Sequence, residues 1–280
     1  MEIRSAFIGI LALASAASAQ NILLVDASGY ASDVVTHLQN QGLTVTDFGS
    51  GTPDLATLQQ YDAVMAFSDG SFADPVALGD VLADYVDAGG RVVQTTFAFY
   101  EGGFGLGIDG RWGAEGYSPF TYGPQTQGTN EYLGKVYNAD HYTLRAVDSF
   151  DGGSSSYRNV VGMTPGAERV ADWTDGTPLI GEVTSKNGVS VGLNFYPPSS
   201  DIRGDFWNAA TDGDTIMYNA LTGRNGCYAD FTGDGVLDLF DFLGYVNTFN
   251  AGDLDADCDA DGELTLFDFL CFVNEFNAGC

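Results

Sequence analysis

The chain has 280 residues, of which 45% are hydrophobic and 13% aromatic, a composition that suits a globular protein and argues against disorder. The net charge of -28 disfavours nucleic acid and anionic membranes as partners, because a strongly acidic surface repels both. After the first residues, no apolar run reaches the length of about 20 residues that a membrane-spanning helix needs.

The N-terminus has the features of an export signal. Arg4 supplies a positive charge, an uninterrupted apolar run covers residues 6–14, and Ala17-Ser18-Ala19 has the small-x-small form that signal peptidase cleaves. We therefore expect residues 1–19 to be a signal peptide and the mature protein to be secreted, either free outside the cell or attached to the cell surface.

Residues 20–222 are expected to form one α/β domain. Short apolar runs predict strands at residues 21–26, 43–48, 61–67 and 91–96, and amphipathic stretches predict helices at 32–38, 55–60 and 74–87. Asp74-Pro75 is typical of a helix start, and Gly89-Gly90 of a helix end. Strands and helices that alternate at this spacing indicate parallel strand–helix–strand units.

The second half of this domain is less regular. A hairpin is expected around Lys186-Asn187-Gly188, between strands at 179–184 and 189–195, after a further strand at 169–173 and before a last helix at 212–221. Residues 97–128 form a long excursion whose aromatic side chains either pack it onto the sheet or stack on sugar rings. These aromatic residues are Phe104, Trp112, Tyr117, Phe120 and Tyr122. Residues 152–158 and 194–200 have the composition of specialised loops, without a motif that assigns them a chemistry.

A ligand crevice is expected beyond the carboxyl ends of the parallel strands, where open α/β sheets bind their ligands. The polar residues expected at this crevice are Asp26, Asp69, Glu101, His141 and Arg158. For His141, an ordinary surface role is the alternative. The residues after the first strand lack the G-x-G-x-x-G pattern of dinucleotide sites.

The order of strands and helices, with the Gly89-Gly90 turn before the fourth strand, resembles flavodoxin-like class I glutamine amidotransferase-like domains, including ThuA-like proteins. That resemblance implies a flavodoxin-like parallel-sheet sandwich over residues 20–222. Enzymes of this class use a cysteine nucleophile, which here would lie near Thr95-Thr96-Phe97. The domain has no cysteine, so cysteine-dependent glutamine hydrolysis is excluded.

After a linker at residues 223–226, the last 54 residues contain an internal repeat with a period of 27 residues. Residues 229–252 align with residues 256–279 without a gap, and 16 of the 24 positions are identical. The 54 residues carry 12 acidic side chains and no Lys or Arg, so the segment repels itself unless it binds cations.

Each copy carries a calcium loop of the D-x-[DN]-x-[DN]-G type, with ligands at positions 1, 3, 5, 7, 9 and 12. The first ligand set is Asp230, Thr232, Asp234, the carbonyl of Val236, Asp238 and Asp241. The second set is Asp257, Asp259, Asp261, the carbonyl of Glu263, Thr265 and Asp268. We therefore expect two Ca²⁺ ions, with weaker binding at the first site because the hydroxyl of Thr232 replaces a carboxylate.

An apolar helix follows each loop, and none precedes it, so the copies are half EF-hands. The stripes are Phe242, Val246 and Phe249 in the first helix and Phe269, Val273 and Phe276 in the second. An acidic linker would lack the phased helices, and a thrombospondin-like calcium repeat would lack the long apolar helix.

These two loop–helix units, which end in Ala278-Gly279-Cys280, resemble a GC-type dockerin domain over residues 227–280. The resemblance implies a small all-α module that folds on calcium and docks onto a cohesin-like or other surface protein. Loop positions 10 and 11 are often Ser-Thr in type I dockerins but are Leu-Phe in both copies here, at 239–240 and 266–267, which puts an ordinary cohesin partner in doubt.

All four cysteines lie in this module, and they allow three disulfide pairings. Pseudo-twofold packing brings the ends of the module together, which favours Cys227–Cys280. Calcium draws loop positions 1 and 12 together, which favours Cys258–Cys271. A buried free thiol at Cys271 is the alternative.

Two functions fit the sequence. One is a non-catalytic protein that binds a ligand such as a glycan and is held in an extracellular assembly by its dockerin-like module. The other is a carbohydrate-related hydrolase carried by the same module. The absence of a nucleophile and of a clear acid–base pair favours the first.

Overall fold

The computed structural model describes residues 20–184, 186–223, 228–229, 231, 237–253, 256–258 and 263–278. The expected signal peptide at 1–19 lies outside these residues, as does the expected linker apart from Gly223.

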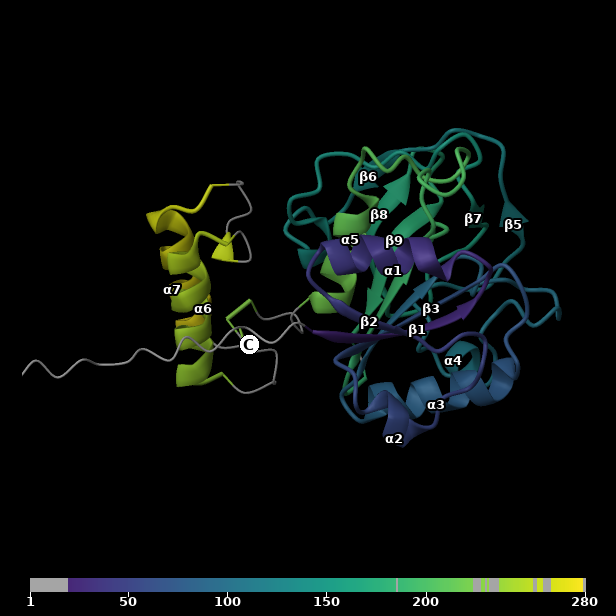
Figure 1. The fold of residues 1–280 in the computed structure, drawn as a ribbon, viewed down its shortest axis with the longest axis horizontal. Coiled ribbons are helices and arrows are strands. Elements are labelled where there is room, and N and C mark those ends of the chain that lie inside the picture. The colour runs from purple at the N-terminus through teal and green to yellow at the C-terminus, as the bar shows by residue number, and fades with distance from the viewer. Residues whose placement is uncertain are drawn as a thin grey trace, which may run out of the picture.

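The α/β domain is built on an eight-stranded mixed sheet with the strand order β2-β1-β3-β4-β10-β9-β8-β6 (Figure 1). Neighbouring strands are parallel from β2 to β10 and antiparallel from β10 to β6. The strands of this sheet are β1 (Asn21–Ala27), β2 (Thr44–Asp47), β3 (Ala63–Ser68), β4 (Arg91–Thr95), β6 (Leu133–Val136), β8 (Glu168–Trp173), β9 (Pro178–Val183) and β10 (Val189–Leu193). A separate antiparallel pair joins β5 (Gln125–Thr126) to β7 (Arg158–Asn159).

Helices cover both faces of the sheet, which confirms the expected α/β class (Figure 1). α1 (Ala31–Asn40) and α5 (Gly213–Thr222) lie on one face, and α2 (Leu55–Leu58), α3 (Pro75–Asp87) and α4 (Arg111–Ala114) lie on the other. The short 3-10 helix η1 spans Tyr142–Leu144. Side chains of β1 alternate between the two cores, because successive residues of a strand face opposite sides. Asp74 caps α3 as predicted, with its carboxylate accepting a hydrogen bond from the Ala77 amide.

The predicted hairpin is also confirmed, since β9 and β10 pair antiparallel on either side of residues 184–188. The excursion after β4 mostly packs onto the sheet. Trp112, Tyr117 and Phe120 are buried, and the Phe120 ring fits against Gly181 and Gly192. A Cβ atom at either glycine would lie 2.7 Å from that ring, so the close contact requires glycine. Packing is therefore the correct interpretation of these three aromatic residues, whereas Phe104 is 68% exposed.

The C-terminal unit is a pair of helices, α6 (Leu239–Ala251) and α7 (Leu266–Ala278), which lie beside each other and apart from the sheet (Figure 1). Its core contains Tyr245 and Phe272, whose rings stack with centroids 4.0 Å apart. The two predicted apolar stripes pack against this core, as the repeat pattern indicates. In the part of the chain that the structure describes, no helix is long and apolar enough to cross a membrane.

Candidate functional site

The carboxyl ends of β1, β3, β4 and β10 meet at one edge of the sheet, and a cavity opens beside them. The chain leaves β1 for β2 on one side and returns to β3 on the other, so the strand order switches between β1 and β3. Open α/β sheets bind their ligands at such a switch point. The cavity has a volume of about 160 Å³. Its lining consists of Asp69, Phe97, Gln125, Gln127, Tyr157, Tyr196, Arg203 and Phe206.

Two carboxyl groups lie at the switch point. Asp26 is the sixth residue of β1 and is 7% exposed, and burial raises its pKa although hydrogen bonds from Ser28 oppose the shift. Asp69 directly follows β3 and lines the cavity, and its amide is held by the Ala27 carbonyl at 3.0 Å. Burial also raises the pKa of Asp69, and the nearby positive charge of Arg203 opposes this.

Tyr196 places an unusual polar group in the lining. It follows β10 and is 3% exposed, and its hydroxyl oxygen has no hydrogen-bond partner of normal geometry among the described residues. Ser28 lies near enough to lower its pKa, but burial dominates and raises the pKa well above the ordinary value for tyrosine. The hydroxyl therefore stays protonated, and it is available to a ligand as both donor and acceptor.

Arg203 is held in place by protein groups. Its Nε atom lies 2.7 Å from Oδ1 of Asp205, and one terminal nitrogen donates to the Tyr157 hydroxyl at 2.8 Å. Burial would raise the pKa of Asp205, but hydrogen bonds from Ser155, Arg203 and Tyr157 lower it. The guanidinium also lies over the Phe206 ring, 4.7 Å from its centroid. The positive charge of Arg203 is thus matched by a carboxylate and covered by an aromatic face.

Aromatic rings form the apolar part of the cavity wall. Phe97 and Tyr196 stack with centroids 5.5 Å apart, and Tyr157 meets Phe97 edge to face. Phe206 contacts both tyrosines edge to face. Rings that hold one another in this way present a rigid, preformed surface.

Asn194 fixes the loop that carries Tyr196. Its side chain is fully buried, donates to the carbonyls of Asn159 and Pro178, and accepts from the Thr96 hydroxyl. One amide thus joins the ends of β4 and β10 to β7 and to the start of β9. Thr96 stands where the related enzymes would carry their nucleophile, and its hydroxyl donates to Asn194 instead of facing the cavity.

The structure brings together some of the expected crevice residues and separates others. Asp26 and Asp69 lie at the crevice, where both act on Tyr196. Glu101 is exposed near the same edge but is not part of the cavity lining. Arg158 is 4% exposed and pairs with Asp175 at 2.7 Å, so its charge serves the loops around β7.

His141 is placed elsewhere and corrects the expectation that it joins the crevice or lies at the surface. It is 7% exposed and its Nε2 atom lies 3.5 Å from Glu182, in a buried cluster that includes Tyr142 and Arg91. Burial would raise the pKa of Glu182, but His141, Tyr142 and Arg91 together lower it. Arg91 is the first residue of β4, so this cluster sits toward the opposite end of that strand from the cavity.

Tyr157, Tyr196 and Arg203 are site residues that no sequence motif identified. The two stretches with the composition of specialised loops, 152–158 and 194–200, contain Tyr157 and Tyr196 respectively. Loop composition was therefore the usable signal, although it did not assign either side chain a role. Arg203 and Phe206 lie just beyond the second stretch, where nothing in the sequence marks them.

The C-terminal unit holds the second candidate site, at the two loops that precede α6 and α7. The described members of the first ligand set are Asp238 and Asp241, and those of the second are Asp257, Glu263, Thr265 and Asp268. The remaining expected ligands, Asp230, Thr232, Asp234, Val236, Asp259 and Asp261, lie outside the described residues.

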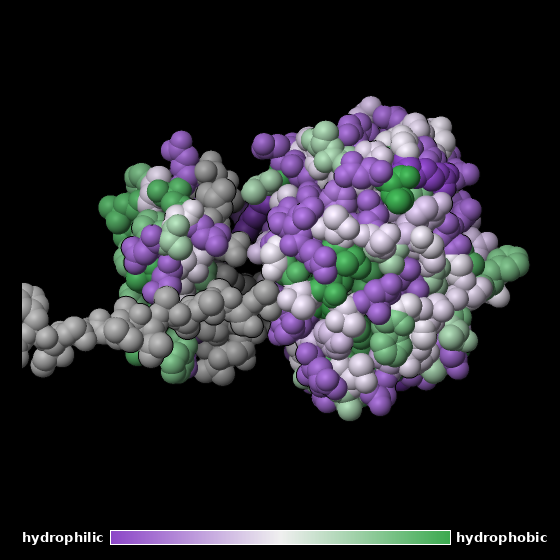
Figure 2. Space-filling view, viewed as in Figure 1, coloured by the Kyte–Doolittle hydropathy of each residue, from purple (hydrophilic) through white to green (hydrophobic). Residues whose placement is uncertain are grey.

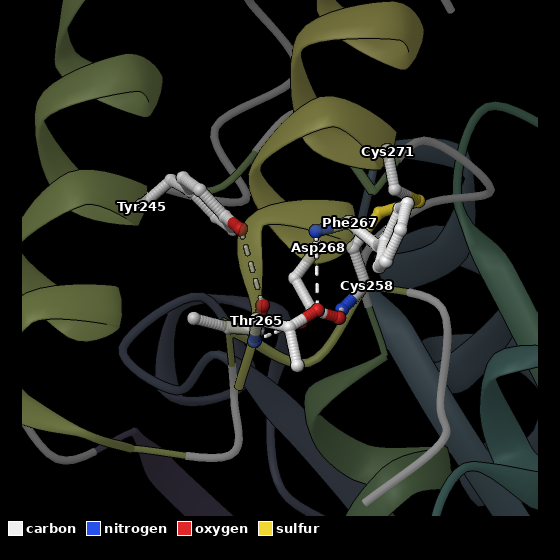
Figure 3. Close-up of a disulfide and its surroundings, with 7 residues drawn as sticks. Tyr245, Cys258, Thr265, Phe267, Asp268 and Cys271 are labelled. Carbon is white, nitrogen blue, oxygen red and sulfur yellow. Dashed lines mark hydrogen bonds between the residues drawn. A yellow bond between two sulfur atoms is a disulfide. The ribbon is translucent and has the colours of Figure 1, made fainter. Parts of the chain in front are cut away.

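Position 12 is built in the same way in both copies. Asp241 is fully buried and accepts from the Asp238 amide at 2.8 Å, and Asp268 is fully buried and accepts from the Thr265 amide. In the second loop, Asp268 also accepts from the Cys258 amide at 3.0 Å, which joins the two ends of the loop (Figure 3). These carboxylates fit a calcium ion, because a calcium loop must bring its first and last positions to one point and supply hard oxygen ligands.

The Cys258–Cys271 disulfide forms as predicted and ties loop position 2 to α7, with the Cα atoms 5.8 Å apart (Figure 3). The first copy has Phe231 and Gly244 at the equivalent positions, so only the second loop carries this link. The other predicted pair, Cys227–Cys280, lies outside the described residues.

Apolar side chains are exposed at matching positions of the two copies. Leu239 and Phe240 are 65% and 67% exposed, and Leu266 and Phe267 are 68% and 70% exposed. Figure 2 shows apolar side chains at the surface of the helix pair. Because each pair begins its helix at loop positions 10 and 11, the repeat presents the same apolar surface twice.

Comparisons with known proteins bear on the α/β domain. No protein-family model and no curated protein matches the sequence. Among solved structures, a cytoplasmic protein from Salmonella typhimurium is 12% identical with a TM-score of 0.53, covering 72% of this chain and 97% of that chain. A protein described as a GMP synthase component from Thermoplasma acidophilum is 9% identical with a TM-score of 0.51, covering 72% and 92%.

A ThuA-like protein from Bacteroides uniformis is 14% identical with a TM-score of 0.50, covering 77% of this chain and 95% of that chain. Identities this low show a shared fold and nothing further. The α/β domain therefore has the flavodoxin-like fold of these proteins, in agreement with the resemblance drawn from the order of its elements.

Proposed function

We propose that this is a secreted protein whose α/β domain binds a small ligand and whose C-terminal, calcium-binding, dockerin-like module attaches it to an extracellular or cell-surface assembly. The observation that carries the proposal is the duplicated apolar surface of Leu239, Phe240, Leu266 and Phe267 at the starts of α6 and α7. Exposed apolar groups that recur at equivalent positions favour a protein partner, because isolated apolar side chains at a surface need no such duplication.

Calcium supports the same proposal through the charge of the module. Asp241 and Asp268 are fully buried in a segment that carries 12 acidic residues and no Lys or Arg. Buried carboxylates are stabilised by a bound cation, and calcium binding of this kind contributes directly to folding. The ion would hold both loops, and thereby the two apolar pairs, in one fixed arrangement.

Attachment is tested with the full mature chain and a panel of immobilised cohesin modules, with calcium or with a chelator. We expect calcium-dependent retention that survives Leu239→Ala/Phe240→Ala or Leu266→Ala/Phe267→Ala alone and is lost when all four residues are changed. Phe104→Ala, which removes an equally exposed aromatic ring from the α/β domain, is the matched control. Retention that persists in the fourfold variant would refute the proposed surface, and absence of retention across the panel would refute a cohesin-like partner.

A carbohydrate-related hydrolase is the second candidate, and the raised pKa of Asp69 in the cavity favours it, since an acid catalyst must keep its proton. Glycoside hydrolysis uses two carboxyl groups that flank the bond, and Asp69 is the one carboxyl group in the described lining. We therefore place ligand binding first. Release of sugar from a glycan panel by the mature chain, abolished by Asp69→Asn, would reverse this order.

A further inference from the structure

The ligand class of the cavity can be narrowed from its charges, and this inference rests on the ligand-binding part of the proposed function. We infer that the cavity binds one neutral sugar ring, with Asp69 and Tyr196 hydrogen-bonded to its hydroxyl groups and the aromatic wall against its apolar face.

Size sets the first limit. A volume of about 160 Å³ corresponds to roughly five molecules of liquid water at about 30 Å³ each. Drug-sized and dinucleotide ligands occupy several hundred cubic ångströms, so the cavity suits a single small ring.

Charge sets the second limit. Asp69 carries the only charge in the described lining that no salt bridge within 4.0 Å matches, because Arg203 is paired with Asp205. An anionic ligand would meet an acidic wall without an available cation. A cationic ligand would normally use the aromatic faces, but the guanidinium of Arg203 already lies over Phe206 and Tyr157. A neutral ligand is therefore the best match.

Hydrogen-bonding capacity sets the third limit. The Tyr196 hydroxyl is buried at the cavity without a partner of normal geometry among the described residues, and leaving such a group unsatisfied is unfavourable unless a ligand completes it. The carboxylate of Asp69 accepts from two donors at once, which suits adjacent hydroxyl groups. Gln125 and Gln127 add amides that both donate and accept. A ring with several hydroxyl groups and an apolar C–H face satisfies all of these groups and the aromatic wall together.

The test is saturation-transfer NMR on the full mature chain with neutral monosaccharides (glucose, galactose, mannose, xylose and arabinose) at millimolar concentration. Glucuronate and protonated glucosamine serve as matched probes, because they keep the ring and change only its charge. We expect at least one neutral sugar to bind more tightly than either charged probe.

Variants then assign the site. We expect Asp69→Asn to weaken binding about tenfold or more, and Tyr196→Phe to weaken it by about two- to tenfold, as lost charged and neutral hydrogen bonds do. Glu101→Gln is the matched control, since it removes one carboxylate from the same edge of the sheet outside the cavity lining; we expect it to bind like the parent chain. Circular dichroism verifies that each variant is folded.

Three results would overturn the inference: no binding of any neutral sugar, tighter binding of glucuronate or glucosamine, or binding that Asp69→Asn and Tyr196→Phe leave unchanged. Retention on the cohesin panel reports on attachment separately. If the sugars fail while calcium-dependent attachment persists, the ligand class is wrong and the proposed attachment stands.

Discussion

At the scale of single residues, Tyr196 shows how a binding site differs from a packed core. Its ring is held by Phe67, Phe97 and Phe206, yet its buried hydroxyl has no partner of normal geometry among the described residues. Such a group destabilises the free protein and becomes favourable only when a ligand reaches it.

Tyr196→Phe should therefore leave the free energy of unfolding unchanged or raise it by up to about 1 kcal/mol, because it removes an unsatisfied polar atom. Tyr142→Phe is the control, since the Tyr142 hydroxyl bonds to Arg91 and Glu182. That change should lower the free energy by about 1–3 kcal/mol. Urea unfolding of both variants measures the difference, and equal destabilisation would contradict our account of Tyr196.

Asp26 predicts a pH dependence of stability. Burial raises its folded-state pKa above the ordinary value of 3.8, so its ionisation penalises the folded state as the pH rises through that folded-state pKa. Below pH 3.8 the penalty is absent. Asp26→Asn lacks the ionisation and can keep the hydrogen bond from the Ser28 amide. Its stability relative to the parent chain should therefore be greater at neutral pH than in acid.

Asp54→Asn supplies the opposite sign. The Thr57 hydrogen bonds lower the pKa of Asp54, so its contribution is present above pH 3.8 and is lost as the pH falls through the folded-state pKa. Thermal unfolding of both variants across this range is the measurement. A stability difference for Asp26→Asn that grows toward acid pH would show that burial does not govern this carboxyl group.

At the scale of secondary-structure elements, the disulfide distinguishes the two calcium loops. Cys258 and Cys271 are 13 residues apart in sequence, and the bond holds the Cys258 amide beside Asp268. Closing a loop of this size contributes roughly 3 kcal/mol by the chain-entropy model. The second loop should thus stay partly preformed without calcium, whereas the first should depend on the ion.

Changing Cys258 and Cys271 together to serine should lower the stability of the module by about 2–3 kcal/mol and weaken calcium binding at the second site more than at the first. Calcium titrations of the two single-site chains, Asp234→Ala and Asp261→Ala, measure the sites separately. Equal weakening at both sites would show that the disulfide acts on the whole module and not on its own loop.

The elements could be predicted from the sequence where a simple period governs them. β1, β3 and β4 are apolar runs, α3 has Asp74-Pro75 at its start, and the repeat fixes α6 and α7. β6 escaped prediction because it is an edge strand of four residues with little burial, and β5 and β7 have only two residues each.

The cavity could be predicted only in part, for a physical reason. Asp26 and Asp69 follow from their places at strand ends, a rule that the fold supplies. Tyr157, Tyr196 and Arg203 come from loops whose paths are set by Asn194 and by aromatic packing between distant segments. Contacts of that kind leave no local pattern, and for the same reason the sequence could not separate His141 from the crevice.

At the scale of the whole molecule, charge is distributed unevenly between the two units. The last 54 residues contribute 12 of the 38 acidic residues and none of the ten basic ones. The α/β domain can offset part of its charge with internal pairs such as Arg158–Asp175 and Arg203–Asp205. The C-terminal unit has no such means, so a bound cation is the natural source of compensation.

Calorimetric titration of the oxidised, chelator-treated mature chain with calcium tests the central claim most directly. The account predicts two bound ions per chain, with one ion left in Asp234→Ala or Asp261→Ala and none when both residues are changed. It also predicts tighter binding at the second site, where Thr232 has no counterpart and the disulfide supports the loop. Absence of calcium uptake at millimolar concentration by the folded parent chain would contradict the account.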